Sequence, residues 1–147
     1  VLTQTAVEAG ILLCFMIAIG NIGLSTLLIV PILVLLTLFS FGIGLLVALL
    51  NVRYRDVAYL VAVGLQVLFY ATPIVYSESI VEKHPAAATA LKFNPMTHFV
   101  GAMRHAVYLL QAPTLLNWIV MVGATAFTVV VGWTVFAHKA PQFIEEI

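Results

Sequence analysis

The sequence predicts an all-α membrane protein with four transmembrane helices and short external helices that are re-entrant or interfacial. The chain is 63% hydrophobic and only 8% charged, and residues 9–52 contain no charged side chain. Because about 20 apolar residues cross the hydrocarbon core of a bilayer, this uncharged run is long enough for two crossings. The composition excludes a disordered or ordinary globular chain, and the zero net charge provides no basic surface for nucleic acid.

The uncharged run is divided by the turn-forming residues Gly20-Asn21-Ile22-Gly23. We therefore expect a first span over residues 6–22 and a second over residues 24–50. Glu8, near the start of the first span, is a functional candidate if it lies inside the bilayer. Its polar neighbours in the sequence instead favour a position at the membrane interface.

The second span is longer than the hydrocarbon core requires. Pro31 predicts a kink in it, and Gly42 and Gly44 predict a close contact with another helix. A short charged loop over residues 51–56 follows at once. The positive-inside rule places such a loop, with its two arginines, in the cytoplasm.

A third span is expected over residues 57–76, where Tyr70 and Tyr76 near its far end fit an interfacial aromatic belt. A fourth is expected over residues 117–137, followed by a polar cytoplasmic tail over residues 138–147. Four crossings place both chain ends on the same side of the membrane as the charged loop.

The region between the last two spans, residues 77–116, is enriched in polar residues and is expected outside the cell. Asn94-Pro95 predicts a helix start, with Asn as the N-cap and Pro in the first helical position, and the pattern continues to Gln111. Its apolar face holds Phe99, Val100, Met103, Val107 and Leu110. Its polar face holds Thr97, Gly101, Arg104, Tyr108 and Gln111, with His98 and His105 at the edge. A helix this short with an internal arginine favours an interfacial or re-entrant position over a crossing.

Catalytic and metal-binding motifs are missing from this sequence. His84, His98 and His105 do not have the spacing of a zinc site, and we interpret them as solvated interfacial side chains. No nucleophile elbow, phosphate-binding glycine-rich loop or catalytic carboxylate pair is present. We therefore assign no catalytic residue and no metal, and any ATP must be bound by another chain.

The segment Asn51-Val52-Arg53-Tyr54-Arg55-Asp56-Val57 resembles the type-2 ABC exporter permeases for polysaccharide and polyol phosphate, which handle O-antigen, capsule, teichoic acid and related cell-wall glycans. Three further segments agree with this family in the same order. They are Thr72-Pro73-Ile74-Val75-Tyr76, Asn94-Pro95-Met96-Thr97 and Phe143-Ile144-Glu145-Glu146-Ile147. The resemblance covers nearly the whole chain.

The resemblance implies a permease of six spans with cytoplasmic termini, external re-entrant helices that gate a channel, and pairing of two permeases. The four spans here correspond to the family's third to sixth. The family's first two spans, its N-terminal amphipathic helix and its coupling helix have no counterpart here. Since the first residues, Val1-Leu2-Thr3-Gln4-Thr5, look like the interior of a longer protein, we expect a fragment that does not transport alone.

The function implied by the resemblance is that of a permease subunit of an ATP-driven exporter of lipid-linked polysaccharide in the bacterial plasma membrane. The implied partners are an ABC ATPase that binds ATP and magnesium, a second copy of the permease, the lipid-linked glycan and membrane lipid. Three other interpretations stay open. They are a type-2 ABC permease for drugs or lipids, an intramembrane enzyme that uses the histidines or Glu8, and a non-catalytic membrane assembly subunit.

The resemblance also suggests roles for three groups of residues. One group lies at the cytoplasmic entrance and consists of Arg53, Tyr54, Arg55 and Asp56. These residues would contact an anionic lipid-pyrophosphate headgroup or hold neighbouring helices together by charge pairing. The alternative is simple anchoring at the membrane interface, with a local Arg–Asp pair. Phe69, Tyr70 and Tyr76 would line a sugar path, or else pack in the core or the aromatic belt. Asn94, Pro95 and Arg104 would shape the gate helix.

Overall fold

The computed structural model describes residues 24–54, 56–74 and 91–144, together with the single positions 7, 10, 11, 14 and 89. The described part contains helices and turns but no strand. Its elements are η1 (Leu24–Leu28), α2 (Ile29–Arg53), α3 (Val57–Tyr70), α6 (Pro95–Val107) and α7 (Leu115–Ile144). The expected first span over residues 6–22 lies outside the continuous described stretches, as does most of the connection over residues 75–90.

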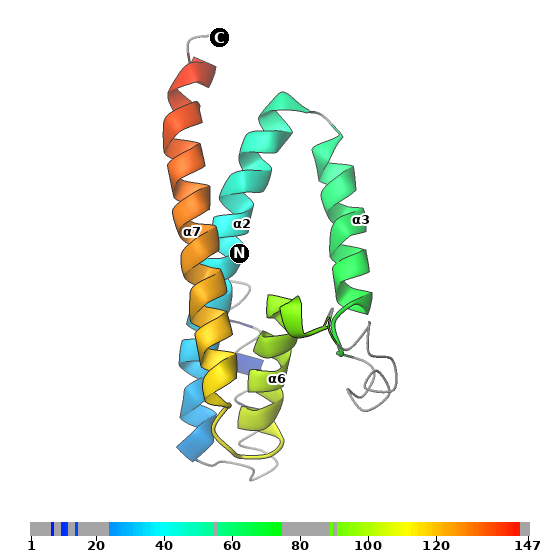
Figure 1. Ribbon diagram of the computed structural model, residues 1–147, viewed down its shortest axis with the longest axis vertical. Helices are drawn as coiled ribbons and strands as arrows, with labels where there is room; N and C mark the ends of the chain where they lie inside the picture. Colours follow the sequence, from blue (N-terminus) through cyan, green and yellow to red (C-terminus); the bar gives the residue numbers. More distant parts are fainter. Residues whose placement is uncertain are drawn as a thin grey trace.

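Two long helices form the frame of the molecule. In Figure 1, α2 and α7 lie side by side and run in the same direction, whereas α3 and α6 run in the opposite direction. The main helix contact is that of α2 with α7, and α6 packs against both of them near the start of α2. The α2–α3 connection and the end of α7 therefore lie at one end of the molecule, and the α6–α7 connection lies at the other.

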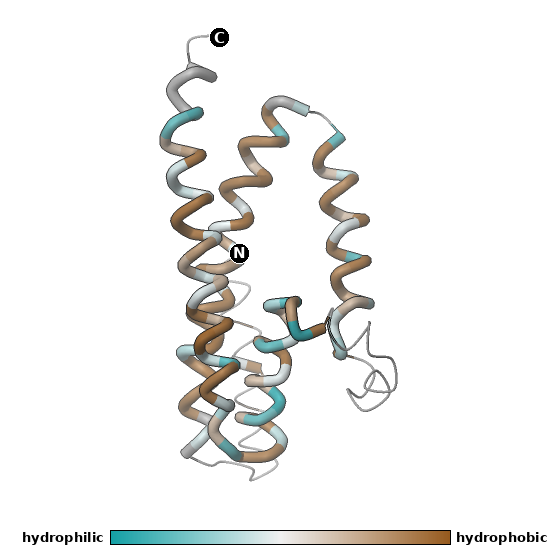
Figure 2. The backbone as a smooth tube through the Cα atoms, in the orientation of Figure 1, coloured by the Kyte–Doolittle hydropathy of each residue, from teal (hydrophilic) through white to brown (hydrophobic). Residues whose placement is uncertain are grey.

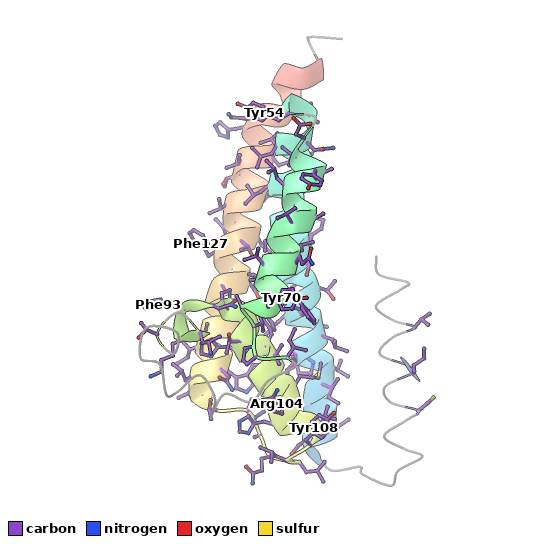
Figure 3. The ribbon with its side chains drawn as sticks, turned by 90° about the vertical axis from the view of Figure 1, so that its right-hand side faces the viewer. Tyr54, Tyr70, Phe93, Arg104, Tyr108 and Phe127 are labelled. Atoms are coloured by element: carbon purple, nitrogen blue, oxygen red, sulfur yellow. The ribbon has the colours of Figure 1, made fainter. Side chains whose placement is uncertain are left out.

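Both frame helices have the length and composition of membrane spans. The spanning segments are Ile29–Val52 and Leu115–Lys139, and only 22% and 17% of their most hydrophobic windows are buried. The core helix of a soluble protein would bury most of such a surface. Hydrophobic residues extend along both helices in Figure 2, and Phe127 in α7 points away from the bundle in Figure 3, 69% exposed. An exposed apolar surface of this kind is stable in contact with lipid, and the backbone polar groups of a helix are paired within it, which supports the predicted all-α membrane fold.

Two glycines allow α2 and α7 to approach each other. A Cβ atom on Gly42 would lie 2.5 Å from the backbone carbon of Thr128, and one on Gly132 would lie 2.5 Å from the Gly42 carbonyl oxygen. Small residues permit this approach between membrane helices. The expected contact at Gly42 is confirmed, whereas Gly44 is exposed and a Cβ added to it would have no described atom within 4 Å, so no contact of Gly44 is found among the described residues.

A change of helix type precedes Pro31. The chain enters as the 3-10 helix η1 and becomes α-helical at Ile29, so Pro31 lies in the first turn of α2. Proline is tolerated in the first turn of an α-helix. The kink expected at Pro31 stays a prediction.

The core lies between α2, α6 and α7. Its buried apolar side chains are Ile29, Ile32, Phe39, Phe99, Ala102, Ala106 and Met121. The rings of Phe39 and Phe99 are 5.6 Å apart at an angle of 41°. Because lipid is as apolar as these side chains, close packing and dispersion hold the helices together here, more than exclusion of water.

The buried face of α6 differs from the predicted apolar face. Phe99 is buried, and Met103 and Val107 pack against the core, as expected. Ala102 and Ala106 are fully buried but were not assigned to this face, and Val100 is only half-buried. Helix α6 packs against both α2 and α7, and its small residues lie where it approaches them.

Helix α6 also ends earlier than the predicted Gln111. It stops at Val107, with Tyr108 as the C-cap, whose N–H donates to the Arg104 carbonyl. Leu110 then takes a φ of 50°, a left-handed conformation that reverses the chain toward α7. The Ser25 hydroxyl donates to the Leu110 carbonyl over 2.8 Å, which fixes this turn against η1.

Helix α3 is shorter than the span expected over residues 57–76. It ends at Tyr70 and is followed by a turn over residues 71–74. Pro73 explains the end, because it lacks an N–H for another helical bond and disfavours helical geometry in the preceding Thr72. The 14 residues of α3 extend about 21 Å, less than the roughly 30 Å of a hydrocarbon core.

Candidate functional site

The predicted cytoplasmic loop joins α2 to α3 at one end of the molecule. Tyr54 caps α2 by donating its N–H to the Leu50 carbonyl, and its own carbonyl accepts from the N–H of Val57. The side chains of Tyr54 and Asp56 are exposed. Arg55 and the side chain of Arg53 lie outside the described residues, so the proposed Arg–Asp pair remains a prediction.

The other candidate residues lie farther along the chain and away from this loop. Figure 3 places Tyr54 near one end, with Arg104 and Tyr108 toward the opposite end and Tyr70 between them. The structure therefore separates the predicted entrance residues from the predicted gate-helix residues. A single site that combines both groups is excluded among the described residues.

Asn94 connects the start of α6 with the end of α3. Its Oδ1 accepts from the N–H of Met96 at 3.0 Å, which confirms the predicted N-cap with Pro95 in the first turn. Its Nδ2 donates to the Thr72 hydroxyl at 3.1 Å and to the Ala71 carbonyl at 3.4 Å. One side-chain amide therefore makes hydrogen bonds both to the first turn of α6 and to the two residues after α3.

Arg104 forms a second connection to the end of α3. Its Nη2 donates to the Pro73 carbonyl at 3.0 Å, and the side chain is half-buried. Carbonyls just after a helix have no partner within that helix, and an unpaired carbonyl is costly where water is scarce. Arg104 therefore anchors α6 to the turn after α3 rather than merely lying on a polar face.

His98 joins three segments of the chain and is buried. Its Nδ1 lies 3.0 Å from Asn117 Oδ1 at the start of α7, and its Nε2 lies 3.0 Å from the Lys92 carbonyl before α6. With an exposed fraction of 8%, this side chain contradicts the predicted solvated histidine. The prediction failed because the partners lie 6 and 19 residues away and only the fold brings them together.

No metal centre is formed by the part of the chain that the structure describes, where no three His, Cys, Asp or Glu side chains converge. His84 lies outside that part. His105 is half-buried, and its Nδ1 has no hydrogen-bond partner among the described residues; the same holds for the Thr97 hydroxyl. Two such atoms on one helix do not form a ligand set.

The aromatic candidates lie on the outside of α3. Phe69 and Tyr70 pack edge to face, with ring centroids 5.6 Å apart, and they are 45% and 67% exposed. They line no closed path among the described residues, so a sugar-contact role remains a proposal. Tyr76 lies outside the described residues.

The comparison with known proteins assigns the family. Residues 2–108 match the family described as ABC-2 type transporter, which is well over half of the chain. The chain belongs to the ABC-2 type transporter family. The resemblance inferred from the sequence is thereby confirmed at the level of the family.

Curated relatives of this ABC-2 transporter chain include permeases named for O-antigen export. The O-antigen export system permease protein RfbA of Myxococcus xanthus is 27% identical over 121 residues, which are 80% of this chain and 45% of the relative. The RfbA protein of Klebsiella pneumoniae is 35% identical over 68 residues, 46% of this chain and 25% of the relative. The chain thus spans at most about half the length of these relatives. No solved structure matches it.

Proposed function

We propose that this chain forms part of the membrane-spanning permease subunit of an ATP-driven exporter for lipid-linked polysaccharide in the bacterial plasma membrane. The observation that supports this substrate is the match to O-antigen export permeases, which covers 80% of the chain for the Myxococcus xanthus protein. The Arg53-Tyr54-Arg55-Asp56 segment points the same way.

The proposed exporter contains further chains. A separate ATPase subunit binds ATP and magnesium and drives transport. A second copy of the permease completes the pathway. The match to the ABC-2 type transporter family supports the ATPase partner, whereas the second permease copy is proposed from the sequence resemblance.

We also propose a direction for the pathway. The loop over residues 51–56 faces the cytoplasm, where Arg53 and Arg55 meet the anionic headgroup of the lipid-linked glycan. Helix α6 faces the exterior. The supporting geometry is the placement of this loop and of α6 toward opposite ends of the frame helices (Figure 1).

The substrate is tested by depleting the full-length gene in the native cell and measuring lipid-linked glycan. We expect the lipid-linked glycan to accumulate inside the cell while the polymer at the surface is lost. Unchanged glycan pools, in a strain without a redundant exporter, would instead favour a drug or lipid permease of the same family.

The headgroup contact is tested in the same cells by replacing Arg55 with Ala. We expect loss of export with normal amounts of the protein in the membrane, because alanine removes both the positive charge and the bidentate hydrogen-bond donors of arginine. Arg55→Lys serves as the matched variant and should retain part of the activity. Loss of the protein itself would contradict a headgroup role and assign Arg55 to folding.

A further inference from the structure

Helix α6 is attached to its two sides by different kinds of contact. Toward α2 and α7 it packs through buried apolar residues, with Phe99 on Phe39 and with Ala102 and Ala106 fully buried. Toward α3 its hydrogen bonds reach the residues just after that helix. We use the name α3–α6 latch for Asn94 and Arg104 together with Ala71, Thr72 and Pro73.

Helix α3 has little apolar attachment to the rest of the described structure. Only Val57, in its first turn, is buried. The side chains beyond it are largely exposed, among them Leu60, Leu65 and Val67 at 60% or more. Figure 1 shows α3 joined to α2 at one end and meeting the start of α6 at the other. The described contacts thus hold α3 at its two ends.

The latch is buried at its centre even though it consists of a few hydrogen bonds. Thr72 is 1% exposed; its hydroxyl donates to the Leu68 carbonyl at 2.7 Å and accepts from Asn94. Breaking these bonds uncovers Thr72 and Pro73, which are both fully buried, but it leaves the apolar contacts of α6 with α2 and α7 in place. When the bonds open, water or the hydroxyl groups of a sugar chain can satisfy the same donors and acceptors, so opening leaves no polar group unpaired.

We propose that the α3–α6 latch is a releasable restraint in the transport cycle. When it opens, α3 swings about the Tyr54–Asp56 connection, while α6 stays with α2 and α7 as one packed unit. The separation of α3 from α6 opens the pathway on the exterior side. This inference rests on the proposed export function and adds the moving part and the residues that restrain it.

The test is to lock the latch covalently in the full-length transporter. In a background with the exposed Cys14 replaced by Ser, the pair Thr72→Cys and Asn94→Cys is joined by a short bis-methanethiosulfonate reagent in cells. We expect export to fall to background after cross-linking and to return on reduction. Export that continues at the unlinked rate after complete cross-linking would overturn the proposal.

A matched pair controls for cross-linking itself. Ser25 and Leu110 connect η1 with the turn after α6 through a 2.8 Å hydrogen bond, within the unit that is proposed to move together. The pair Ser25→Cys and Leu110→Cys should cross-link with no loss of export. Loss of export from this pair as well would mean that α6 itself must move, and would overturn the assignment of α3 as the moving part.

A second cysteine pair across the latch is used if the first pair prevents folding. If the Thr72/Asn94 variant does not reach the membrane, Pro73→Cys with Arg104→Cys spans the other half of the latch and carries the same expectation. Export by the unlinked Cys14→Ser protein is measured first. If that protein moves no glycan, the proposed function fails; if it exports and the locked variants also export, only the latch fails.

Discussion

His98 illustrates how one side chain joins distant parts of this chain. Both ring nitrogens face carbonyl oxygens, those of Asn117 and Lys92. If the Asn117 oxygen faces the ring, both ring nitrogens must donate, as they do in the imidazolium form. If the Asn117 amide is rotated so that its NH₂ group faces the ring, the neutral ring makes both hydrogen bonds. In either form the ring connects the segment before α6 to the start of α7.

Replacing His98 with Ala should therefore destabilise the protein. The substitution removes two partly buried hydrogen bonds, and each such bond contributes about 0.5–1.5 kcal/mol. Thermal unfolding of the purified full-length protein in detergent measures the effect. The matched control is His138→Ala, because His138 is exposed near the end of α7 and its loss should be neutral. Equal stability of the two variants would contradict the role of His98 as a connector.

The residue scale also shows what local sequence can and cannot reveal. The N-cap at Asn94 was predictable, because its partner Met96 is two residues away and the Asn-Pro pattern is specific. The bonds from Asn94 to Thr72 and from Arg104 to Pro73 were not, because they cross 22 and 31 residues of the chain. They form only because the fold brings α6 next to the turn after α3.

At the scale of elements, the close contact between α2 and α7 depends on two glycines, Gly42 and Gly132, which have no side chain. Gly42→Ala should push the two helices apart, because its Cβ would overlap the backbone of Thr128. Overpacking of this kind costs about 1–3 kcal/mol. Gly44→Ala is the matched control two residues away, where a Cβ meets no described atom; better helix propensity should make it neutral or stabilising by up to about 1 kcal/mol.

Unfolding temperatures of these two glycine variants, measured side by side, distinguish a packing contact from a general preference for glycine. A decrease for Gly42→Ala alone is the expected result. A similar decrease for both variants would contradict the assignment of the contact to Gly42. The membrane frame would then depend on the glycines through backbone flexibility rather than through close approach.

The packing of α6 also depends on small side chains. Ala102→Leu should displace α6 from α2 and α7, because the alanine is fully buried and a larger side chain has no space there; we expect a loss of about 1–3 kcal/mol. Gly101→Ala, one residue earlier, is the control, since its nearest contact would be Asn117 Nδ2 at 3.9 Å. Export and unfolding temperature are measured together. Normal values for Ala102→Leu would show that α6 is loosely packed.

The elements themselves were only partly predictable. The hydrophobic runs predicted α2 and α7, because about 20 uncharged residues leave few alternatives to a spanning helix. The same criterion made α3 too long, since hydrophobicity continues past Tyr70 while Pro73 ends the helix. The predicted apolar face of α6 did not include Ala102 and Ala106, which are fully buried, because the periodicity does not say how many neighbours a helix has.

At the scale of the whole molecule, the directions of the helices fix which segments share an end. Asp56, before α3, lies at the end of the frame where α7 finishes, and Gln111, after α6, lies at the end where α7 begins. Both side chains are exposed. If α2 and α7 each cross the bilayer, these two positions must face opposite sides of the membrane.

Cysteine labelling tests this arrangement in living cells. With Cys14 replaced by Ser, we expect Gln111→Cys to react with a membrane-impermeant maleimide in intact cells. Asp56→Cys should react only after permeabilisation, because the positive-inside rule retains the arginine-containing loop in the cytoplasm. His138→Cys, near the end of α7, is the control and should behave like Asp56→Cys. Labelling of Gln111 and His138 from the same side would refute the crossing of α7, and the reverse of the expected pattern would invert the direction of export proposed for this chain.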